Sequence, residues 1–237
     1  MQLNYGSLNC NSIIKTNNTH TQKSFIRFLL QQKFTILSLQ ETHTSISNSS
    51  SIAQQFCCKQ SFWTPHCGII SFSDQFILTQ IPTTLTDRIL LCKVHHPHQF
   101  YQPFYILNLY APASSGTARK HFFESLLSYL YSVPDISLDR LIISGDFNYS
   151  YLRTTTLSQN TSSNWLAFLA NSFYNIMETK NYQLLPTFYR NMEISSTIDY
   201  IFVSNDFHIS TDYTDIIMLR PNWSDHCVLV TRVHPEY

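Results

Sequence analysis

Short apolar runs alternate with polar segments rich in Ser, Thr and Asn along the chain, and the clearest run ends at a glycine. Residues 140–146 read Arg-Leu-Ile-Ile-Ser-Gly-Asp, and Asn148 follows shortly after. A short apolar run bounded by turn residues predicts a buried strand. Gly145 allows a backbone conformation that a β-carbon resists, so we expect Asp146 and Asn148 at the rim of a sheet. An Asx turn that closes an ordinary strand would give the same local pattern.

The remaining periodicity predicts an α/β protein. Residues 117–131 carry apolar side chains on one face, which is typical of an amphipathic helix, whereas residues 44–51, 151–163 and 188–196 are polar and predict loops. Two packed sheets with helices outside them, in a single domain spanning residues 1–237, accommodate this order. The predicted strands are 2–9, 34–39, 68–72, 75–78, 88–94, 104–110, 140–146, 197–203, 216–219 and 227–231, and the predicted helices are 20–32, 117–131 and 165–174.

The composition gives no general attraction to nucleic acid. Lys and Arg together number 15, Asp and Glu also number 15, and the formal net charge is therefore zero. A nucleic-acid partner needs a local basic strip or a bound cation under these conditions. Hydrophobic residues make up 43% of the 237 positions, which is enough for a sizeable core.

The cysteines and the hydropathy pattern exclude several protein classes. None of the six cysteines forms a C-x-x-C pair, so we expect no zinc site and mostly reduced core thiols. The N-terminus has no basic head followed by an apolar stretch, and we find no run of ~18 apolar residues. We therefore expect no signal peptide, no membrane span and an intracellular location.

Polar residues recur at the ends of the predicted strands. Asn9, Glu41, Tyr110 and Asp146 each follow a strand-like run, whereas Asp199, Asp225 and His226 each precede or begin one. If the first strands point toward one rim and the last two run antiparallel to them, all of these side chains meet at that rim. We adopt this arrangement because it uses every one of them.

Six short motifs carry a resemblance that covers nearly the whole chain. They resemble, in order, those of the endonuclease/exonuclease/phosphatase superfamily, and more narrowly the apurinic-type endonuclease domain of non-LTR retrotransposons. Asn11 stands where repair enzymes of the superfamily have Asp, which favours the retrotransposon branch. The motifs are Leu8-Asn9-Cys-Asn11, Leu39-Gln40-Glu41-Thr42, Asn108-Leu-Tyr110-Ala-Pro112, Ser144-Gly-Asp146-Phe-Asn148, Ile198-Asp199-Tyr-Ile and Ser224-Asp225-His226.

The resemblance implies a four-layer α/β/β/α sandwich of two mixed β-sheets flanked by helices, and a metal-dependent cleavage of phosphodiesters. Glu41 would be the main ligand of Mg²⁺, with Mn²⁺ as a substitute and Asn11 as a weaker ligand. This ion keeps several waters and takes only one or two carboxylates. Asp146 would deprotonate the attacking water, while Asn148 and Asn9 would hydrogen-bond that water or the phosphate.

The other motif residues would stabilise the phosphoryl group and the leaving oxygen. His226 would donate to a non-bridging oxygen, with Asp199 orienting its ring. Asp225 would help to place the metal or its waters, and Tyr110 would approach the phosphate or the leaving group. Two further residues are expected to contact substrate, namely Thr187 and Ser224.

Each of these residues has a plainer alternative when taken alone. A single histidine on an apolar strand is more often a satisfied core residue, and Glu41 by itself would be a solvated charge at a strand end. A buried unpaired Asp199 would be unfavourable, so we expect it to have a partner. The cluster at residues 95–98, His-His-Pro-His, favours a solvated turn over a transition-metal site.

Three functions remain open at this point. The first is a Mg²⁺-dependent endonuclease that nicks one DNA strand and leaves a 3′-hydroxyl and a 5′-phosphate, in the nucleus. We would expect it to stand next to a reverse transcriptase domain in a longer parent element. The second is a phosphatase or other phosphodiesterase of the same fold, which needs a compact pocket. The third is a decayed nucleic-acid-binding or interaction module, although the intact set of motif residues argues against decay.

Overall fold

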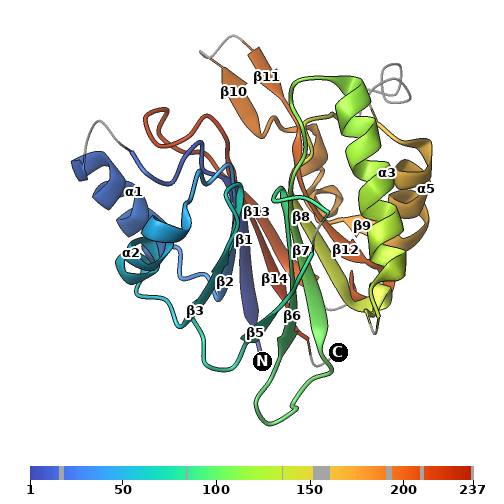
Figure 1. Cartoon of the computed structure of the whole chain (residues 1–237), viewed down its shortest axis with the longest axis horizontal. Helices are drawn as coiled ribbons and strands as arrows, with labels where there is room; N and C mark the ends of the chain where they lie inside the picture. The colour runs from blue at the N-terminus through green and yellow to red at the C-terminus, as the bar shows by residue number, and fades with distance from the viewer. Residues whose placement is uncertain are drawn as a thin grey trace.

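Two six-stranded sheets pack face to face in the computed structural model, and helices cover both outer surfaces (Figure 1). The structure describes residues 1–15, 19–83, 85–134, 136–151, 161–190, 194–208 and 211–235. The predicted α/β sandwich of two mixed sheets flanked by helices is confirmed. The assignment of all 237 residues to a single domain stays a prediction.

Each sheet combines strands from distant parts of the sequence. The first sheet has the order β13-β14-β1-β2-β4-β3 and the second has the order β5-β6-β7-β8-β12-β9, with a separate β10-β11 hairpin. The strands of the first sheet are β1 (Leu3–Asn9), β2 (Ile36–Gln40), β3 (Gln60–Trp63), β4 (Cys67–Ser71), β13 (Thr211–Ile217) and β14 (Val228–Val233). Those of the second are β5 (Ile77–Ile81), β6 (Ile89–His95), β7 (Phe104–Tyr110), β8 (Leu141–Asp146), β9 (Phe173–Asn175) and β12 (Asp199–Ser204), and the hairpin is β10 (Phe188–Arg190) with β11 (Ile194–Ser196).

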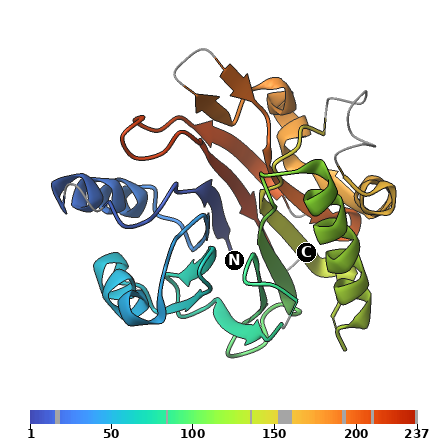
Figure 2. The ribbon, with the colours of Figure 1, turned by 45° about the horizontal axis from the view of Figure 1, so that its top comes forward.

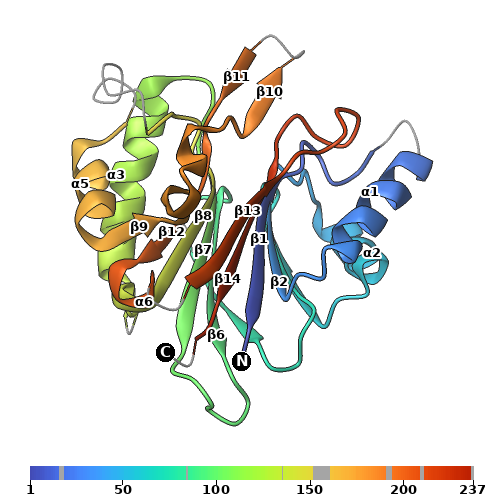
Figure 3. The same cartoon turned by 180° about the vertical axis from the view of Figure 1, so that it is seen from behind.

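The helices lie on the two outer faces. Figures 1 and 3 show α1 and α2 over the first sheet and α3 and α5 over the second. No helix of the described segments is long and apolar enough to cross a bilayer. The helices are α1 (Thr19–Gln31), α2 (Ile46–Phe56), α3 (Gly116–Ser132), α5 (Ser163–Ser172) and α6 (Asn205–His208), with 3₁₀ turns η1 (Leu138–Arg140), η2 (Ile176–Lys180) and η3 (Tyr182–Leu184).

Strand alternation produces three layers of core. On β6, Leu90 and Cys92 point into the layer between the sheets, whereas Ile89 and Leu91 pack against the helix side. Successive strand side chains face opposite sides of a sheet, so one apolar run serves two layers. The first sheet does the same with α1 and α2, whose buried Phe25 contributes to the third layer.

Strand direction brings the polar strand ends together. β1 runs parallel to β2, and β7 runs parallel to β8, while β14 and β12 are antiparallel to β1 and β8 respectively. The C-terminal ends of four strands and the N-terminal ends of two therefore share one rim. Figure 2 turns this rim toward the viewer.

A buried polar network below the rim links the two sheets. Gln40 on β2 donates to Asn108 on β7 at 2.7 Å, and Asn108 donates to the carbonyl oxygens of Leu39 and Gly68. Beside it, the Tyr5 hydroxyl lies within hydrogen-bonding distance of Ser38 and Ser144. Buried polar groups need such partners, so this network favours one relative position of the sheets.

Several predicted boundaries were wrong, most clearly the loop at residues 44–51. Helix α2 begins there at Ile46, since the Asn48 side chain accepts the backbone N–H of Ser45 at 2.9 Å. The helix is retained because Ile52 and Phe56 are buried against the sheet. The helix was not predicted because its sequence is rich in Ser and Asn and has only two buried apolar residues, one turn apart, instead of a longer apolar stripe.

Other corrections concern strands. Residues 68–72 and 75–78, whose spacing around Ser73 and Asp74 predicts a pair of strands, do not pair with each other, because β4 lies in the first sheet and β5 in the second. The loop expected at 188–196 contains β10 and β11, and the strand expected at 216–219 lies earlier, as β13. The helix expected at 165–174 ends at Ser172, where β9 begins. Most of the predicted 151–163 loop falls outside the described residues.

Gly145 provides a direct test of how the chain leaves β8. Its φ is +143°, and a β-carbon there would lie 1.9 Å from the Leu109 carbonyl oxygen. We expect Gly145→Ala to lower the free energy of unfolding by roughly 2–4 kcal/mol, because backbone must move. Urea denaturation measures this. Gly116→Ala, at the first position of α3, is the matched control and should be neutral or slightly stabilising; equal effects of the two changes would refute the steric argument.

Candidate active site

One side-chain amide links the two sheets at the rim. Asn9, at the end of β1, is fully buried and donates to Glu41 Oε2 at 3.1 Å and to Asp146 Oδ2 at 2.9 Å. Its own Oδ1 accepts the Asn11 backbone N–H at 3.0 Å. Glu41 directly follows β2 with a φ of +52°, and its side chain is 25% exposed. The amide therefore fixes two carboxylates, one of which reaches solvent.

A histidine–aspartate pair stands across from these carboxylates. His226 Nδ1 lies 2.9 Å from Asp199 Oδ2, and both side chains are almost completely buried. Thr187 donates its hydroxyl to the same Asp199 oxygen at 2.7 Å and accepts the backbone N–H groups of Ile198 and Asp199. Because Nδ1 faces Asp199, Nε2 is the ring nitrogen left to face a substrate.

The chain before His226 is tied to β1. The Ser224 hydroxyl donates to the Asn9 carbonyl oxygen at 2.7 Å and accepts the His226 backbone N–H at 3.1 Å. Asp225 accepts the side-chain N–H of Asn11 at 3.1 Å, and its Oδ1 lies 4.0 Å from His226 Nε2. These contacts fix the histidine relative to the Asn9 amide.

Tyr110 and Asn148 complete the rim on the second sheet. Tyr110 stands opposite Asp146 in the β7–β8 register, and its hydroxyl lies near enough to Glu41 for that carboxylate to raise its pKa. Asn148 has a φ of +52° and donates its side-chain amide to the Ala111 carbonyl oxygen at 2.8 Å. The backbone N–H of Asn148 donates to Asp146 Oδ1 at 2.8 Å.

Burial and mutual repulsion dominate the electrostatics. Burial, followed by the negative charge of Asp199, raises the pKa of Asp146 to about 7, against the opposing effects of His226 and Asn9. Burial alone would lower the pKa of His226, but the charge of Asp199 and its hydrogen bond raise it to about 9. Burial and the charges of Glu41 and Asp146 raise the pKa of Tyr110 to about 12, so its hydroxyl stays protonated at neutral pH.

The residues fit a divalent cation. Among the motif residues at the rim, His226 is the one cationic group. Four carboxylates accompany it, from Glu41, Asp146, Asp199 and Asp225. Carboxylate and amide oxygens are the donors that hard divalent cations take. Ligand atoms of Asp146, Asp199 and His226 lie within 4.8 Å of one another. The His226–Asp199 bond already occupies part of that group, which leaves the Glu41 side of the rim for an ion.

The structure gathers the expected residues but places three of them differently. Asn9, Thr187 and Ser224 were expected to contact phosphate, water or substrate. All three are buried, and their polar atoms bond to other rim residues. These contacts connect them to Asp146, Asp199 and His226 respectively, and we interpret the three as positioning residues. The roles of all the rim residues stay predictions.

Sequence reasoning missed a second group of residues beside Glu41. His43 Nε2 lies 3.5 Å from Glu41 Oε1, and the Arg88 guanidinium lies 4.8 Å above the Tyr110 ring. The His66 ring is 5.7 Å from the same ring. Lys15 donates to the carbonyl oxygens of Cys10 and Asn11. Only His43, two residues after Glu41, carried a local sequence signal.

Two further features singled out in the sequence are the cysteines and the histidine cluster at residues 95–98. Four of the six cysteines, namely Cys10, Cys67, Cys92 and Cys227, are free and buried. Among the described residues, no group with metal-ligand geometry includes His95, His96 or His98.

Known proteins show the same architecture. A family model described as the Endonuclease/Exonuclease/phosphatase family matches residues 6–226. The endonuclease domain of TRAS1, a telomere-specific non-LTR retrotransposon, is 15% identical, with 100% of each chain covered and a TM-score of 0.70. An AP endonuclease from Archaeoglobus fulgidus is 15% identical over 97% of this chain and 98% of that one, with a TM-score of 0.74. D. rerio TDP2 complexed with single strand DNA product is 16% identical over 98% and 99%, with a TM-score of 0.68. No curated protein sequence matches the chain.

The raised pKa of Asp146 predicts a pH-dependent stability. Its folded pKa of about 7 exceeds the ordinary value of 3.8, so its contribution is complete below pH ~4 and is lost as the pH rises through ~7. We compare the unfolding free energies of Asp146→Asn and the wild type in EDTA. The difference between them should shift in favour of Asp146→Asn by roughly 2–4 kcal/mol from pH 4 to pH 8. Urea denaturation across this range gives the slope. Asp206→Asn, an exposed change in α6, should show no slope; a flat Asp146→Asn difference would contradict the burial argument.

The Thr187 hydroxyl predicts a positioning effect. Thr187→Val removes the donor to Asp199 while retaining the shape of the side chain, so kcat for phosphodiester cleavage should fall about tenfold with little change in KM. Thr187→Ser should restore most of kcat, because the hydroxyl returns. If the serine variant were as impaired as the valine variant, packing rather than the hydrogen bond would explain the loss.

Proposed function

The chain belongs to the Endonuclease/Exonuclease/phosphatase family, whose members are metal-dependent phosphodiester hydrolases, and we propose that it is a Mg²⁺-dependent DNA endonuclease. It would nick one strand and leave a 3′-hydroxyl and a 5′-phosphate. The observation that carries this proposal is the Asn9 amide, which holds the partly exposed Glu41 beside the buried Asp146 and opposite His226. Hydrolysis needs a cation site, a base and a phosphate donor close together, and these three groups supply them.

Asp146 is the proposed base. It is buried, and its pKa is about 7, near neutral pH. A carboxylate with this pKa is partly ionised at neutral pH and accepts a proton well. Asp146 Oδ2 would take a proton from the attacking water. Asn148 donates its side-chain amide to Ala111, which leaves its Oδ1 to accept the other hydrogen of that water.

His226 is the proposed phosphate donor. With its pKa raised to about 9, the ring is doubly protonated at neutral pH. Nδ1–H donates to Asp199, and Nε2–H would donate to a non-bridging phosphate oxygen, where charge develops in the transition state. Phe188, whose ring centroid lies 4.9 Å from that of His226, limits the movement of the imidazole.

Glu41 is the proposed ligand for the ion, with Asn11 and Asp225 nearby to hold its waters. A bound Mg²⁺ supplies positive charge to the phosphoryl oxygens and the leaving oxygen. Mn²⁺ accepts the same oxygen donors. Tyr110, protonated and close to Glu41, would hydrogen-bond the phosphate or the leaving oxygen.

Three features support a DNA substrate and a retrotransposon origin. The fold is similar to that of the TRAS1 endonuclease domain over the full length of both chains. Asn11 stands where repair enzymes of the superfamily have Asp. The β10–β11 hairpin rises from the rim next to His226, where it would contact a duplex lying across the site (Figure 1). We extend the proposal to a reverse transcriptase domain in the parent element and to a nuclear location.

A second candidate has its own structural support. A cavity of about 440 Å³ opens beside His226, between the β10 strand and the segment that precedes Ser224, and its walls include Asn11, Tyr189 and Met218. A pocket of this size accommodates a small ester. A phosphatase or other phosphodiesterase of the same fold is therefore the alternative function.

Supercoiled plasmid separates these functions. We expect relaxed circles with Mg²⁺ and intact supercoiled plasmid with EDTA. Asp146→Ala and Glu41→Ala should each reduce the nicking rate by at least about 100-fold, because the base or the ion is lost. Agarose electrophoresis measures the rates, and ligation of the nicks by DNA ligase reports the 3′-hydroxyl and 5′-phosphate.

Lys23→Glu is the control variant, since it changes an exposed charge on α1, the helix that covers the outer face of the first sheet. Nicking that persists in Asp146→Ala would disprove the proposed mechanism. Release of phosphate from small monoesters by a protein that leaves plasmid intact would establish the alternative function instead. Binding of plasmid without cleavage or ester hydrolysis would indicate a decayed module.

A further inference from the structure

A large cavity lies far from the rim, at the opposite end of the second sheet. Its volume is about 840 Å³, and it is formed by the end of β6, the start of β7 and the loop between them. Ile89 pairs with Leu109 near the rim, whereas Val94 pairs with Phe104 at the other end. Because each strand residue rises about 3.3 Å, roughly 20 Å of sheet separates this cavity from the proposed active site.

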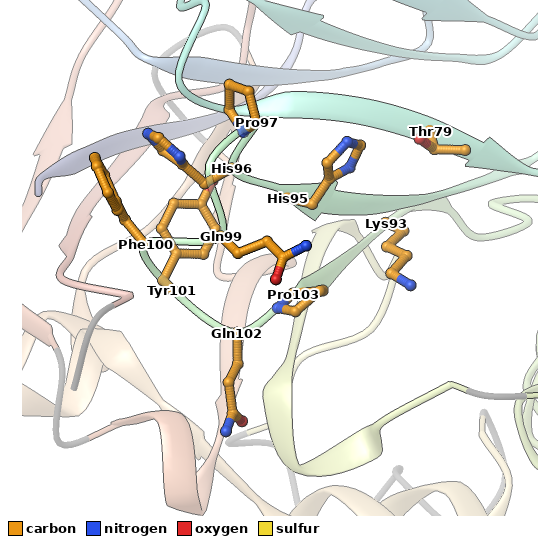
Figure 4. A pocket seen from close by; sticks show the side chains of 10 residues that line it. All are labelled: Thr79, Lys93, His95, His96, Pro97, Gln99, Phe100, Tyr101, Gln102 and Pro103. Atoms are coloured by element: carbon orange, nitrogen blue, oxygen red, sulfur yellow. The ribbon is translucent and has the colours of Figure 1, made fainter.

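The polar wall of the cavity comes from neighbouring strands. Thr79 on β5 stands opposite Lys93 on β6, and Ile77 stands opposite His95. Lys93 and His95 follow Ile89 and Leu91 on the same face of β6, beyond the part of that face that packs against α3. Figure 4 shows Gln99 reaching from the loop toward His95 and Lys93. One cation and several hydrogen-bonding groups therefore face the same space.

The charge around this cavity has one sign. Residues 88–123, which supply most of its lining, contain no Asp or Glu although the whole chain has 15 of them. Within the described part of the chain, Lys93 forms no ion pair. Asp74 lies in the loop where Gln75 accepts the Tyr101 hydroxyl, but it is paired with Lys59 at 3.0 Å. A phosphate at Lys93 would thus meet no carboxylate of the cavity wall.

The loop also offers an aromatic surface. Phe100 is 68% exposed, yet its ring stacks on His96 with centroids 4.5 Å apart and planes 27° apart. His96 and Tyr101 are buried beneath it, and the Tyr101 ring stacks on Phe76. The exposed ring is therefore held in a fixed orientation by buried rings. A fixed, exposed ring close to a cationic side chain is the arrangement that binds single-stranded nucleic acid, whose bases stack while its phosphates are neutralised.

We propose that the cavity at the β6–β7 loop is a second binding site, which takes single-stranded nucleic acid. Lys93, with Thr79, His95 and Gln99, binds a phosphate, and Phe100 stacks on a base. Phe100 lies on the other side of the loop from Lys93 (Figure 4), so a strand of successive nucleotides engages both. The site is independent of the rim. It would hold a single strand whether or not the rim cleaves another strand at the same time.

The test is the binding of a fluorescent ten-nucleotide oligo(dT) to the full chain in EDTA, followed by fluorescence anisotropy at several salt concentrations. Lys93→Glu should weaken binding at least about tenfold and reduce the slope of log Kd against log salt by about 0.7, the loss expected for one phosphate contact. Phe100→Ala should weaken binding at least about fivefold, whereas Phe100→Tyr should bind as the wild type does.

Matched controls place the effect at this site. Lys23→Glu makes the same charge change on α1, and Tyr131→Ala removes an aromatic side chain that is 67% exposed at the end of α3; both should bind as the wild type does. Photo-crosslinks from 4-thiothymidine in the oligonucleotide should map to residues 93–103. The rate of nicking of a short duplex should be the same for all of these variants, which separates this site from the proposed active site.

Three results would overturn the proposal. The first is equal affinity of the wild type, Lys93→Glu and Phe100→Ala. The second is crosslinking confined to rim segments, which would mean that the rim alone binds the strand. Binding of a peptide or protein to the loop, with no affinity for oligo(dT), would likewise replace nucleic acid as the ligand.

Discussion

The structure depends on one amide that stands between two like charges. The Asn9 side-chain amide donates one hydrogen bond to Glu41, directly after β2, and one to Asp146, at the end of β8. These two strands belong to different sheets. Two carboxylates this close repel each other unless a donor or a cation lies between them. The amide supplies the donor without adding charge. It therefore couples the packing of the sheets to the spacing of the groups proposed to bind an ion and to activate water.

The same arrangement opposes stability. Asp146 is buried beside Asp199, and its raised pKa expresses the free energy of keeping it charged there. The protonated His226 and the buried network of Gln40 and Asn108 offset part of this effect. Groups arranged for catalysis commonly destabilise the fold that holds them. The stabilising contacts lie below the rim, in the polar network and the three core layers.

Much of the site could be predicted because strand ends are visible in the sequence. The runs before Asn9, Glu41 and Asp146 stop at polar residues, and strand direction then determines where these residues meet. Contacts between distant residues were not predicted: Gln40 and Asn108 each stand in one of the motifs, but they are 68 positions apart and neither motif indicates the hydrogen bond between them. Helix α2 was missed because capping and two buried anchors, rather than a periodic apolar stripe, define it. The positioning role of Thr187 likewise depends on a partner that only the fold supplies.

The backbone at the strand exits has a consequence for laboratory evolution. Asn11, Glu41 and Asn148 all have positive φ values, between +44° and +52°. Glycine adopts this region more readily than other residues, so each of these side chains is retained against a conformational preference of about 1 kcal/mol. A library selected only for heat resistance or expression would enrich glycine at residue 41 and would accumulate well-folded proteins that lack the proposed metal ligand. Activity has to be selected together with folding if the side chains at the rim are to be retained.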